Sequence, residues 1–237
     1  MHAFLTATGR ILIYFAVCVT VVFSVRCLFR VPNEIFRKIL HLVLLGALVV
    51  WLYVYPTWGY AVISAMAFAL LVYPVLILAE KIRGYSAFVT ERKSGELKSS
   101  LLLVFLMFSI VTVVGWGVFH DRFLTLAAIF AWGLGDAAAA LIGKRFGRHH
   151  LEGNHIEGRK SLEGSAAMFV VSIVSVWWIL RLRGGLSGVG CLVSAVVAAA
   201  VSTVVELFSM HGNDTLFCPL GAMAALLPML YLWGGLG

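Results

Sequence analysis

The sequence predicts an all-α, polytopic membrane protein with about eight transmembrane helices, within a range of seven to nine. Of its 237 residues, 62% are hydrophobic and only 12% are charged. The mean hydropathy is +1.00, and the apolar residues form long unbroken runs. Such runs are typical of spanning helices, whereas a membrane β-barrel shows short alternating segments. We expect residues 1–237 to form a single integral-membrane domain.

Eight apolar segments each approach the ~20 residues that a spanning helix needs. The second is short, and Gly133 and Gly135 interrupt the fifth. These two segments are therefore candidates for a kinked or half-inserted helix. In order, the segments are residues 11–29, 39–55, 58–79, 101–119, 123–143, 162–180, 188–208 and 216–233.

The positive charges predict the orientation of these segments. Thirteen of the 18 Lys and Arg residues lie in the loops 30–38, 80–100 and 144–161, and four lie at the opposite ends of the segments. The positive-inside rule then places the three loops in the cytoplasm and both termini outside. These loops account for the net charge of +7, so no nucleic-acid partner is expected. We expect a multi-pass protein of a cell inner membrane or an ER-type membrane, with its active site facing the cytoplasm.

An acidic residue, Asp136, lies near the end of the alanine-rich fifth segment. Charge at membrane depth is expensive, so an intramembrane carboxylate is a functional candidate by default. We expect Asp136 to bind Mg²⁺ or to position phosphate through the metal. The alternative is a buried carboxylate that pairs with an Arg or Lys for packing.

A glycine-broken loop with five cations follows this segment. A carboxylate with clustered Lys and Arg is the combination that a metal–polyphosphate site requires. Ala138 and Arg145 stand where a P-loop has Gly and Ser or Thr, so any phosphate site here is not a Walker motif. The alternative is a plain positive-inside loop. The residues expected to bind a nucleotide are Gly143, Lys144, Arg145, Gly147, Arg159, Lys160 and Ser161.

The sixth segment starts just after Ser161 and has Glu163 in its first turn. A serine N-cap followed by an acidic residue is typical of a helix start. The same start, with Arg159 and Lys160 beside it, could instead bind phosphate through backbone N–H groups. Glu163 would then ligate metal with Asp136 or orient the lysine.

Two further charged groups are expected to support the site. Glu34, Lys38 and His41 fall on one helical face with Arg37 beside them. A simple ion pair between residues four apart is the alternative for this group. Glu96 belongs to a charged loop, for which solvation alone is a sufficient explanation.

A last polar group lies near the end of the seventh segment. Glu206 is inside the segment, and Asp214 follows in the next turn. An intramembrane glutamate close to a polar turn indicates a site that lines a polar cavity. Capping of the following helix by Asp214 is the alternative.

These motifs resemble those of the CTP-dependent lipid alcohol kinases: dolichol kinase, phytol kinase and the fungal-type diacylglycerol kinase, within the wider cytidylyltransferase-like membrane family. Residues 135–147 and 159–165 resemble the central motif, and residues 34–41 are similar to the first. Residues 205–219 are similar to the last, although Thr215 and Phe217 replace its usual Asn and Thr. The resemblance spans most of the chain. It implies a CTP donor, Mg²⁺ as cofactor and a long-chain lipid alcohol acceptor in the bilayer.

The leading hypothesis is therefore Mg-assisted phosphorylation of a polyprenol, dolichol, phytol or diacylglycerol hydroxyl, giving a lipid monophosphate and CDP. Metal and cations would neutralise and align the transferring group. One alternative is a CDP-lipid synthase that uses the same elements, and another is a non-catalytic membrane transporter or scaffold. The residues expected to be catalytic are Asp136, Lys160, Glu163 and Asp214, with Asp136 and Glu163 as the metal ligands.

Overall fold

The computed structural model describes residues 2–29, 31–81, 95–151, 160–210 and 212–235. Over these residues it is all-helical apart from one isolated β-bridge, which confirms the predicted fold class. Eight helices in the described part of the chain are long and apolar enough to cross a membrane. They are Phe4–Leu28, Asn33–Val54, Trp58–Ala79, Leu97–Val118, Arg122–Phe146, Leu162–Arg183, Gly188–Phe208 and Asp214–Leu232.

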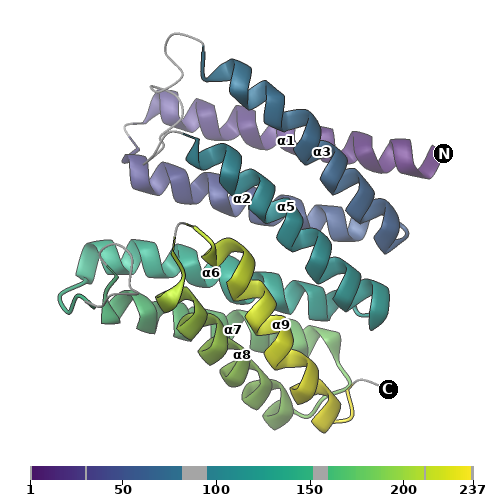
Figure 1. The fold of residues 1–237 in the computed structure, drawn as a ribbon, viewed down its shortest axis with the longest axis vertical. Coiled ribbons are helices and arrows are strands. Elements are labelled where there is room, and N and C mark those ends of the chain that lie inside the picture. Colours follow the sequence, from purple (N-terminus) through teal and green to yellow (C-terminus); the bar gives the residue numbers. More distant parts are fainter. Residues whose placement is uncertain (1, 30, 82–94, 152–159, 211, 236–237) are drawn as a thin grey trace. The chain divides into compact units, whose positions relative to one another are not determined.

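The chain forms two compact units, Met1–Ile110 and Val111–Gly237. The single membrane domain expected from the sequence stays a prediction. Unit 1 contains α1 (His2–Leu28), α2 (Asn33–Val54), α3 (Trp58–Ala79) and most of α5 (Glu96–Thr112) (Figure 1). The second predicted segment is not short, because α2 begins six residues earlier than residue 39 and includes charged residues in its first turns.

An aromatic cluster holds the helices of unit 1 together. The Phe15 ring of α1 stacks on Phe68 of α3 with ring centroids 5.0 Å apart. Trp51 of α2 meets Phe68 and the Phe105 ring of α5 edge-on, both at 5.2 Å. The Trp51 indole also donates to Ser64 Oγ over 2.6 Å. Such ring pairs add to the packing energy beyond the area that they bury.

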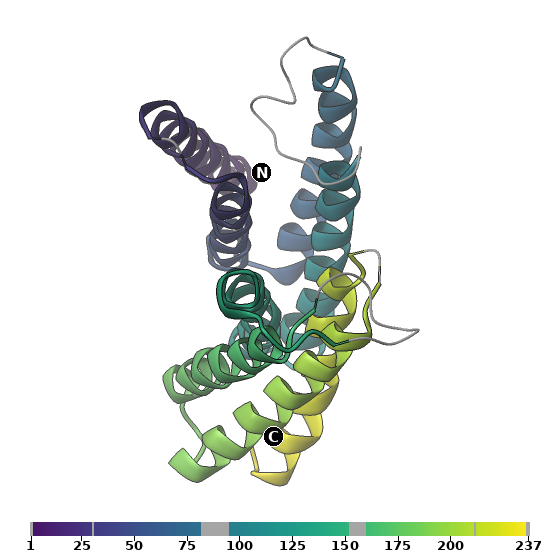
Figure 2. The ribbon, with the colours of Figure 1, turned by 90° about the vertical axis from the view of Figure 1, so that its left-hand side faces the viewer.

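Unit 2 contains the π-helix η1 (Val113–Val118) followed by α6 (Arg122–Phe146), α7 (Leu162–Arg183), α8 (Gly188–Phe208) and α9 (Asp214–Leu232). Helix α6 packs on α7, α8 and α9, and α7 and α9 each pack on α8 (Figure 2). Helix α6 is continuous through Gly133 and Gly135, so these glycines do not end the fifth segment, and a kink there stays a prediction. The neighbouring helix explains Gly135: a Cβ there would lie 2.5 Å from Ser172 Oγ of α7.

Helices α6 and α7 approach each other closely at two facing glycines. A Cβ added to Gly143 would lie 3.4 Å from Gly164 Cα, and one added to Gly164 would lie 3.3 Å from Gly143 Cα and 3.0 Å from the Ala139 carbonyl oxygen. Small residues at such a crossing let two helix backbones pack tightly in a membrane. The crossing brings the charged end of α6 beside the start of α7.

Candidate functional site

The candidate site lies at one end of unit 2. Successive helices alternate in direction, so the ends of α6 and α8 lie with the starts of α7 and α9. The residues that the sequence singled out at 136–163 and 206–214 occupy this end. The positive-inside rule predicts that it is the cytoplasmic end.

A short bridged turn fixes the start of α7. His150 and Ser161 form an antiparallel β-bridge. Leu151 N donates to the Lys160 carbonyl, and Leu162 N donates to the His149 carbonyl, both over 2.9 Å. Because these bonds tie the two sides of the α6–α7 loop together, the backbone position of Lys160 is set by residues nine or more positions earlier.

Ser161 is the N-cap of α7, as the sequence predicts. Its hydroxyl oxygen accepts a hydrogen bond from Gly164 N over 3.1 Å, and its side chain is buried. Two expected nucleotide-binding glycines pack around this hydroxyl: a Cβ on Gly143 or Gly147 would lie 3.1 Å or 2.8 Å from Ser161 Oγ. In this structure the three residues build the α6–α7 junction, and their contact with a nucleotide stays a prediction.

Lys160 reaches across to the end of α8. Its ammonium donates to the main-chain carbonyls of Glu206, Leu207 at 3.3 Å and Ser209 at 3.2 Å. It also forms an ion pair with the Glu206 carboxylate, with Nζ and Oε1 3.3 Å apart. Helix ends leave carbonyl groups unsatisfied and carry partial negative charge, so a half-buried lysine stabilises this helix end. Lys160 thereby joins the start of α7 to the end of α8.

Two further acidic groups lie within electrostatic range of the Lys160–Glu206 pair. Asp136 of α6 and Asp214 of α9 both interact electrostatically with the Glu206 carboxylate. The buried Cys218 thiol on α9 also interacts electrostatically with these three carboxyl groups and with the Lys160 ammonium. Three carboxyl groups and one ammonium group from four parts of the chain are thus gathered at this end of unit 2. We call Asp136, Lys160, Glu206 and Asp214 the charged cluster.

Glu163 has a different partner from the one expected. Its carboxylate lies 2.7 Å from His149 Nδ1 and accepts from His149 N over 3.3 Å. Both groups are partly or largely exposed, with 26% and 77% of the side chains accessible. His149 was missed from the sequence, because only the bridged turn brings it next to Glu163. The pairing of Glu163 with Asp136 as metal ligands stays a prediction.

The remaining cations of the α6–α7 loop are either exposed or lie outside the residues that the structure describes. Lys144 and Arg145 lie exposed in the last turn of α6, and the Arg145 guanidinium lies 5.3 Å from the centroid of the Phe146 ring. Their position suits the negative end of the helix. Arg159 falls outside the described residues.

The expected supporting residues at the chain's beginning belong to unit 1. Arg37 donates to Glu34 over 2.8 Å, so the observed ion pair joins residues three apart. Lys38 is buried, and His41 lies one turn further along α2. Glu96 is the first residue of α5, and its side chain lies outside the described part of the chain. Their contribution to the site stays a prediction.

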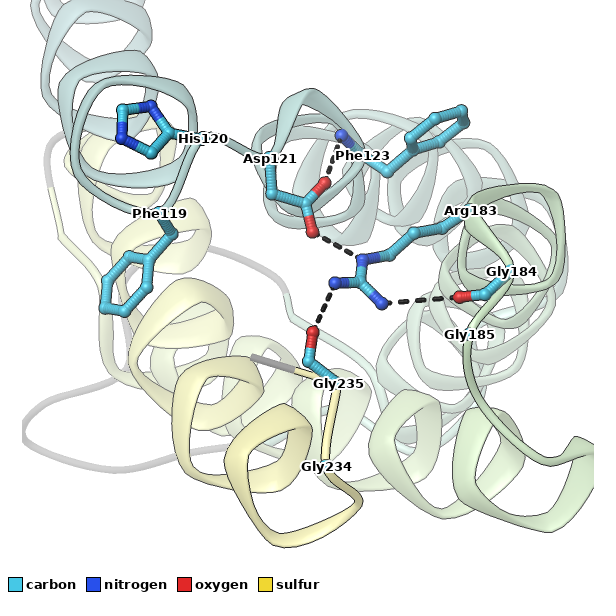
Figure 3. Close-up of a pocket in the computed structure, with 9 residues that line it drawn as sticks. All are labelled: Phe119, His120, Asp121, Phe123, Arg183, Gly184, Gly185, Gly234 and Gly235. Carbon is cyan, nitrogen blue, oxygen red and sulfur yellow. Dashed lines mark hydrogen bonds and ion pairs between the residues drawn. The ribbon is translucent and has the colours of Figure 1, made fainter. Parts of the chain in front are cut away.

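A second polar cluster lies at the opposite end of unit 2, around a hollow of about 480 Å³ (Figure 3). Asp121 caps α6 by accepting from Phe123 N at 2.9 Å and Leu124 N at 3.1 Å. Arg183 at the end of α7 pairs with Asp121 and donates to the Gly184 and Gly235 carbonyls. The Arg183 guanidinium therefore bonds to groups at helix ends and in the turn that contains Gly235. We interpret this cluster as a structural link between those segments.

Comparison with known proteins identifies the family. Phytol kinase from Synechocystis sp. (strain ATCC 27184 / PCC 6803 / Kazusa) is 34% identical to this chain over 217 aligned residues. The alignment covers 86% of this chain and 83% of the relative. The chain belongs to the phytol kinase family of lipid alcohol kinases. No family model and no solved structure matches the chain.

Membership of the phytol kinase family supports lipid kinase activity and a membrane setting. The family resemblance implies Mg²⁺, and the charged cluster offers ligands for it. Among the described residues no group of three or more His, Cys, Asp or Glu could by itself hold a metal ion. Mg²⁺ in kinases usually binds to one or two carboxylates and completes its shell with substrate phosphates and water. One carboxylate of the charged cluster would suffice for an ion that arrives with a nucleotide, and the binding of Mg²⁺ here stays a prediction.

Proposed function

We propose that this chain transfers the terminal phosphoryl group of CTP to the hydroxyl of a membrane-embedded isoprenoid alcohol, with Mg²⁺ as cofactor. The observation that carries the proposal is the charged cluster, which lies where spanning helices end and where a lipid hydroxyl can meet a soluble nucleotide. The phytol kinase relative supports an isoprenoid alcohol of the phytol class as acceptor.

In this mechanism Asp136 would hold Mg²⁺, which would supply neutralising charge to the phosphates. Lys144, Arg145 and Arg159 would attract and orient the triphosphate at the aqueous end. Lys160 would act mainly by fixing the end of α8 and the Glu206 carboxylate, since its ammonium is already engaged there. Glu163, paired with His149, would hold the bridged turn against the nucleotide.

The transfer itself needs little covalent chemistry from the protein. The acceptor oxygen forms a bond to the terminal phosphorus as the bond between that phosphorus and its bridging oxygen breaks. CDP leaves with the electron pair, and the acceptor's proton passes to Asp214. The protein's contribution is alignment and electrostatic stabilisation, which account for most of the rate enhancement in phosphoryl transfer.

The test uses the purified protein in nanodiscs with CTP labelled on its terminal phosphate. Phytol, geranylgeraniol, a longer polyprenol and diacylglycerol are offered in turn, with ATP, GTP and UTP as alternative donors. We expect a labelled lipid monophosphate and CDP with an isoprenoid alcohol, CTP and Mg²⁺, and loss of the product when Mg²⁺ is chelated.

Two outcomes would overturn the proposal. Release of pyrophosphate with formation of a CDP-lipid from phosphatidic acid would make the chain a CDP-lipid synthase. Absence of a phosphorylated lipid with every acceptor and donor would remove the kinase function altogether.

A further inference from the structure

Helix α8 carries a buried hydroxyl that its own backbone does not satisfy. The Ser202 side chain is fully buried, and its Oγ has no hydrogen-bond partner among the residues that the structure describes. The neighbouring Thr203 Oγ1 is buried without a partner in the same part of the chain. Ser109 and Ser209 show the usual solution, since each donates to the carbonyl four residues earlier, over 2.7 Å and 2.6 Å. A buried polar atom without a partner is costly and calls for an explanation.

The two hydroxyls lie about one helical turn from Glu206 of the charged cluster. Ser202 and Thr203 precede Glu206 by four and three residues, which is about 6 Å and 4.5 Å along an α-helix. At 3.6 residues per turn, the direction of Glu206 around the helix falls between those of Ser202 and Thr203. Helix α9 packs against this stretch, because a Cβ on Gly221 would lie 3.2 Å from Val205 Cγ2 and 3.3 Å from Val201 Cγ1. The α9 contact lies on the neighbouring face of α8, and the helical rise places the hydroxyls about one turn further from the end of α8 than the carboxylate.

This position suits one ligand of the proposed reaction. The nucleotide reaches the charged cluster from water, whereas the acceptor comes from the bilayer with an apolar chain and one hydroxyl. That hydroxyl must lie just inside the charged groups to meet the terminal phosphate. We propose that Ser202, assisted by Thr203, binds the hydroxyl of the lipid alcohol and presents its oxygen to the nucleotide. The inference rests on the proposed function and assigns the acceptor's place within it.

The chemistry of a serine fits this role. The Ser202 hydroxyl can donate a hydrogen bond to the oxygen of the lipid alcohol. The O–H of the alcohol is then directed to a carboxylate of the charged cluster. Ser202 does not itself gain or lose a proton in this step. Its role is to bind the lipid alcohol. A site built to hydrogen-bond a hydroxyl also rejects an apolar chain that lacks one.

The experiment compares Ser202→Ala with Ser194→Ala. Ser194 lies on the same helix, is equally buried, and its Oγ also lacks a partner within the described residues. It is eight residues, or about 12 Å, further from the charged cluster. Both variants lose the same group from the same kind of environment, so any general effect on folding should be shared and visible in their unfolding temperatures.

We expect Ser202→Ala to raise the KM for the isoprenoid alcohol about threefold to tenfold, the range of one net hydrogen bond, and to leave the KM for CTP unchanged. Ser194→Ala should leave both constants at the wild-type values. An unchanged KM for the alcohol in Ser202→Ala, or an equal change in Ser194→Ala, would overturn the inference.

A binding measurement separates this inference from the proposed function. Displacement of a fluorescent isoprenoid alcohol in nanodiscs gives the affinity of the O-methyl ether of the alcohol and of the matching hydrocarbon, without turnover. We expect the wild type and Ser194→Ala to prefer the ether about threefold to tenfold, and Ser202→Ala to lose this preference. A preference that survives in Ser202→Ala overturns the inference even if the kinase assay succeeds. A preference that depends on Ser202 upholds the alcohol site even if the kinase assay fails.

Discussion

The two ends of unit 2 use the same device for different purposes. At each end one basic residue joins helix ends: Lys160 bonds to the carbonyls that close α8 and to Glu206, and Arg183 bonds to Asp121 and to the Gly184 and Gly235 carbonyls. The Arg183 tie pairs a guanidinium with a carboxylate that already caps α6. The Lys160 tie lies among two further carboxyl groups, Asp136 and Asp214.

This difference shows what distinguishes a candidate active site from a structural ion pair. A buried pair with all its bonds made within the protein only stabilises helix ends. A pair with additional carboxyl groups near it has the charges that the proposed metal and nucleotide site needs. The hollow beside Arg183 is therefore read as part of a structural tie between helix ends.

The largest expected effect is that of Asp136→Asn at the Lys160 end, with Asp121→Asn as its counterpart at the other end. Removal of the Asp136 charge should lower kcat by about 10²- to 10³-fold, the usual cost of losing one preorganised electrostatic group. Asp121→Asn should leave kcat unchanged in the folded fraction. Initial rates of lipid phosphorylation, corrected for folded protein, provide the measurement. Comparable loss of kcat in both variants would contradict the proposed division between the ends.

The next effect is on folding, and it uses Lys160→Met and Arg183→Met as a matched pair. Each variant leaves a mostly buried carboxylate without its basic partner, so each should lower the free energy of unfolding by about 3 kcal/mol. Only Lys160→Met should also lower kcat, because it releases the end of α8 from the charged cluster. Chemical unfolding followed by tryptophan fluorescence, together with kinetics at low denaturant, separates the two effects. An inactive but folded Arg183→Met would show that the far end also takes part in the reaction.

The smallest effect is expected for the exposed cation Lys144, with the exposed Arg181 at the opposite end of unit 2 as control. Lys144→Ala should raise the KM for CTP about threefold and leave kcat unchanged, because an exposed charge contributes modestly to phosphate binding. The rise should shrink as salt is added. If Arg181→Ala changed the KM for CTP as much, attraction of the nucleotide would depend on the net charge of the protein and not on this loop.

The sequence was sufficient for features that depend on local pattern. The eight spans follow from runs of apolar residues, and the Ser161 cap follows from a serine before a helix start with an acid in the first turn. The family was also accessible, because residues 135–147 and 159–165 carry its central motif. The path of α6 through Gly133 and Gly135 was not predicted, because the packing of α7 against it decides whether those glycines bend the helix.

Contacts between distant segments could not be predicted in the same way. The Lys160 ammonium meets the end of α8 46 residues later, and nothing in either local sequence specifies that meeting. His149 is the partner of Glu163 because the bridged turn brings the two residues together, which neither local sequence indicates. Ser202 carried a weak signal, since it precedes Glu206 by one helical turn, but only its burial and missing partner make it informative.

The crossing at Gly143 and Gly164 has a consequence for how the enzyme would move. Two backbones in contact have no long side chains between them that could change rotamer and let the helices slide. We therefore expect α6 and α7 to behave as a stiff pair. Any opening that admits a nucleotide or releases a phosphorylated lipid would then involve displacement of α8 and α9. The contact between Lys160 and the end of α8 would break and reform in each turnover.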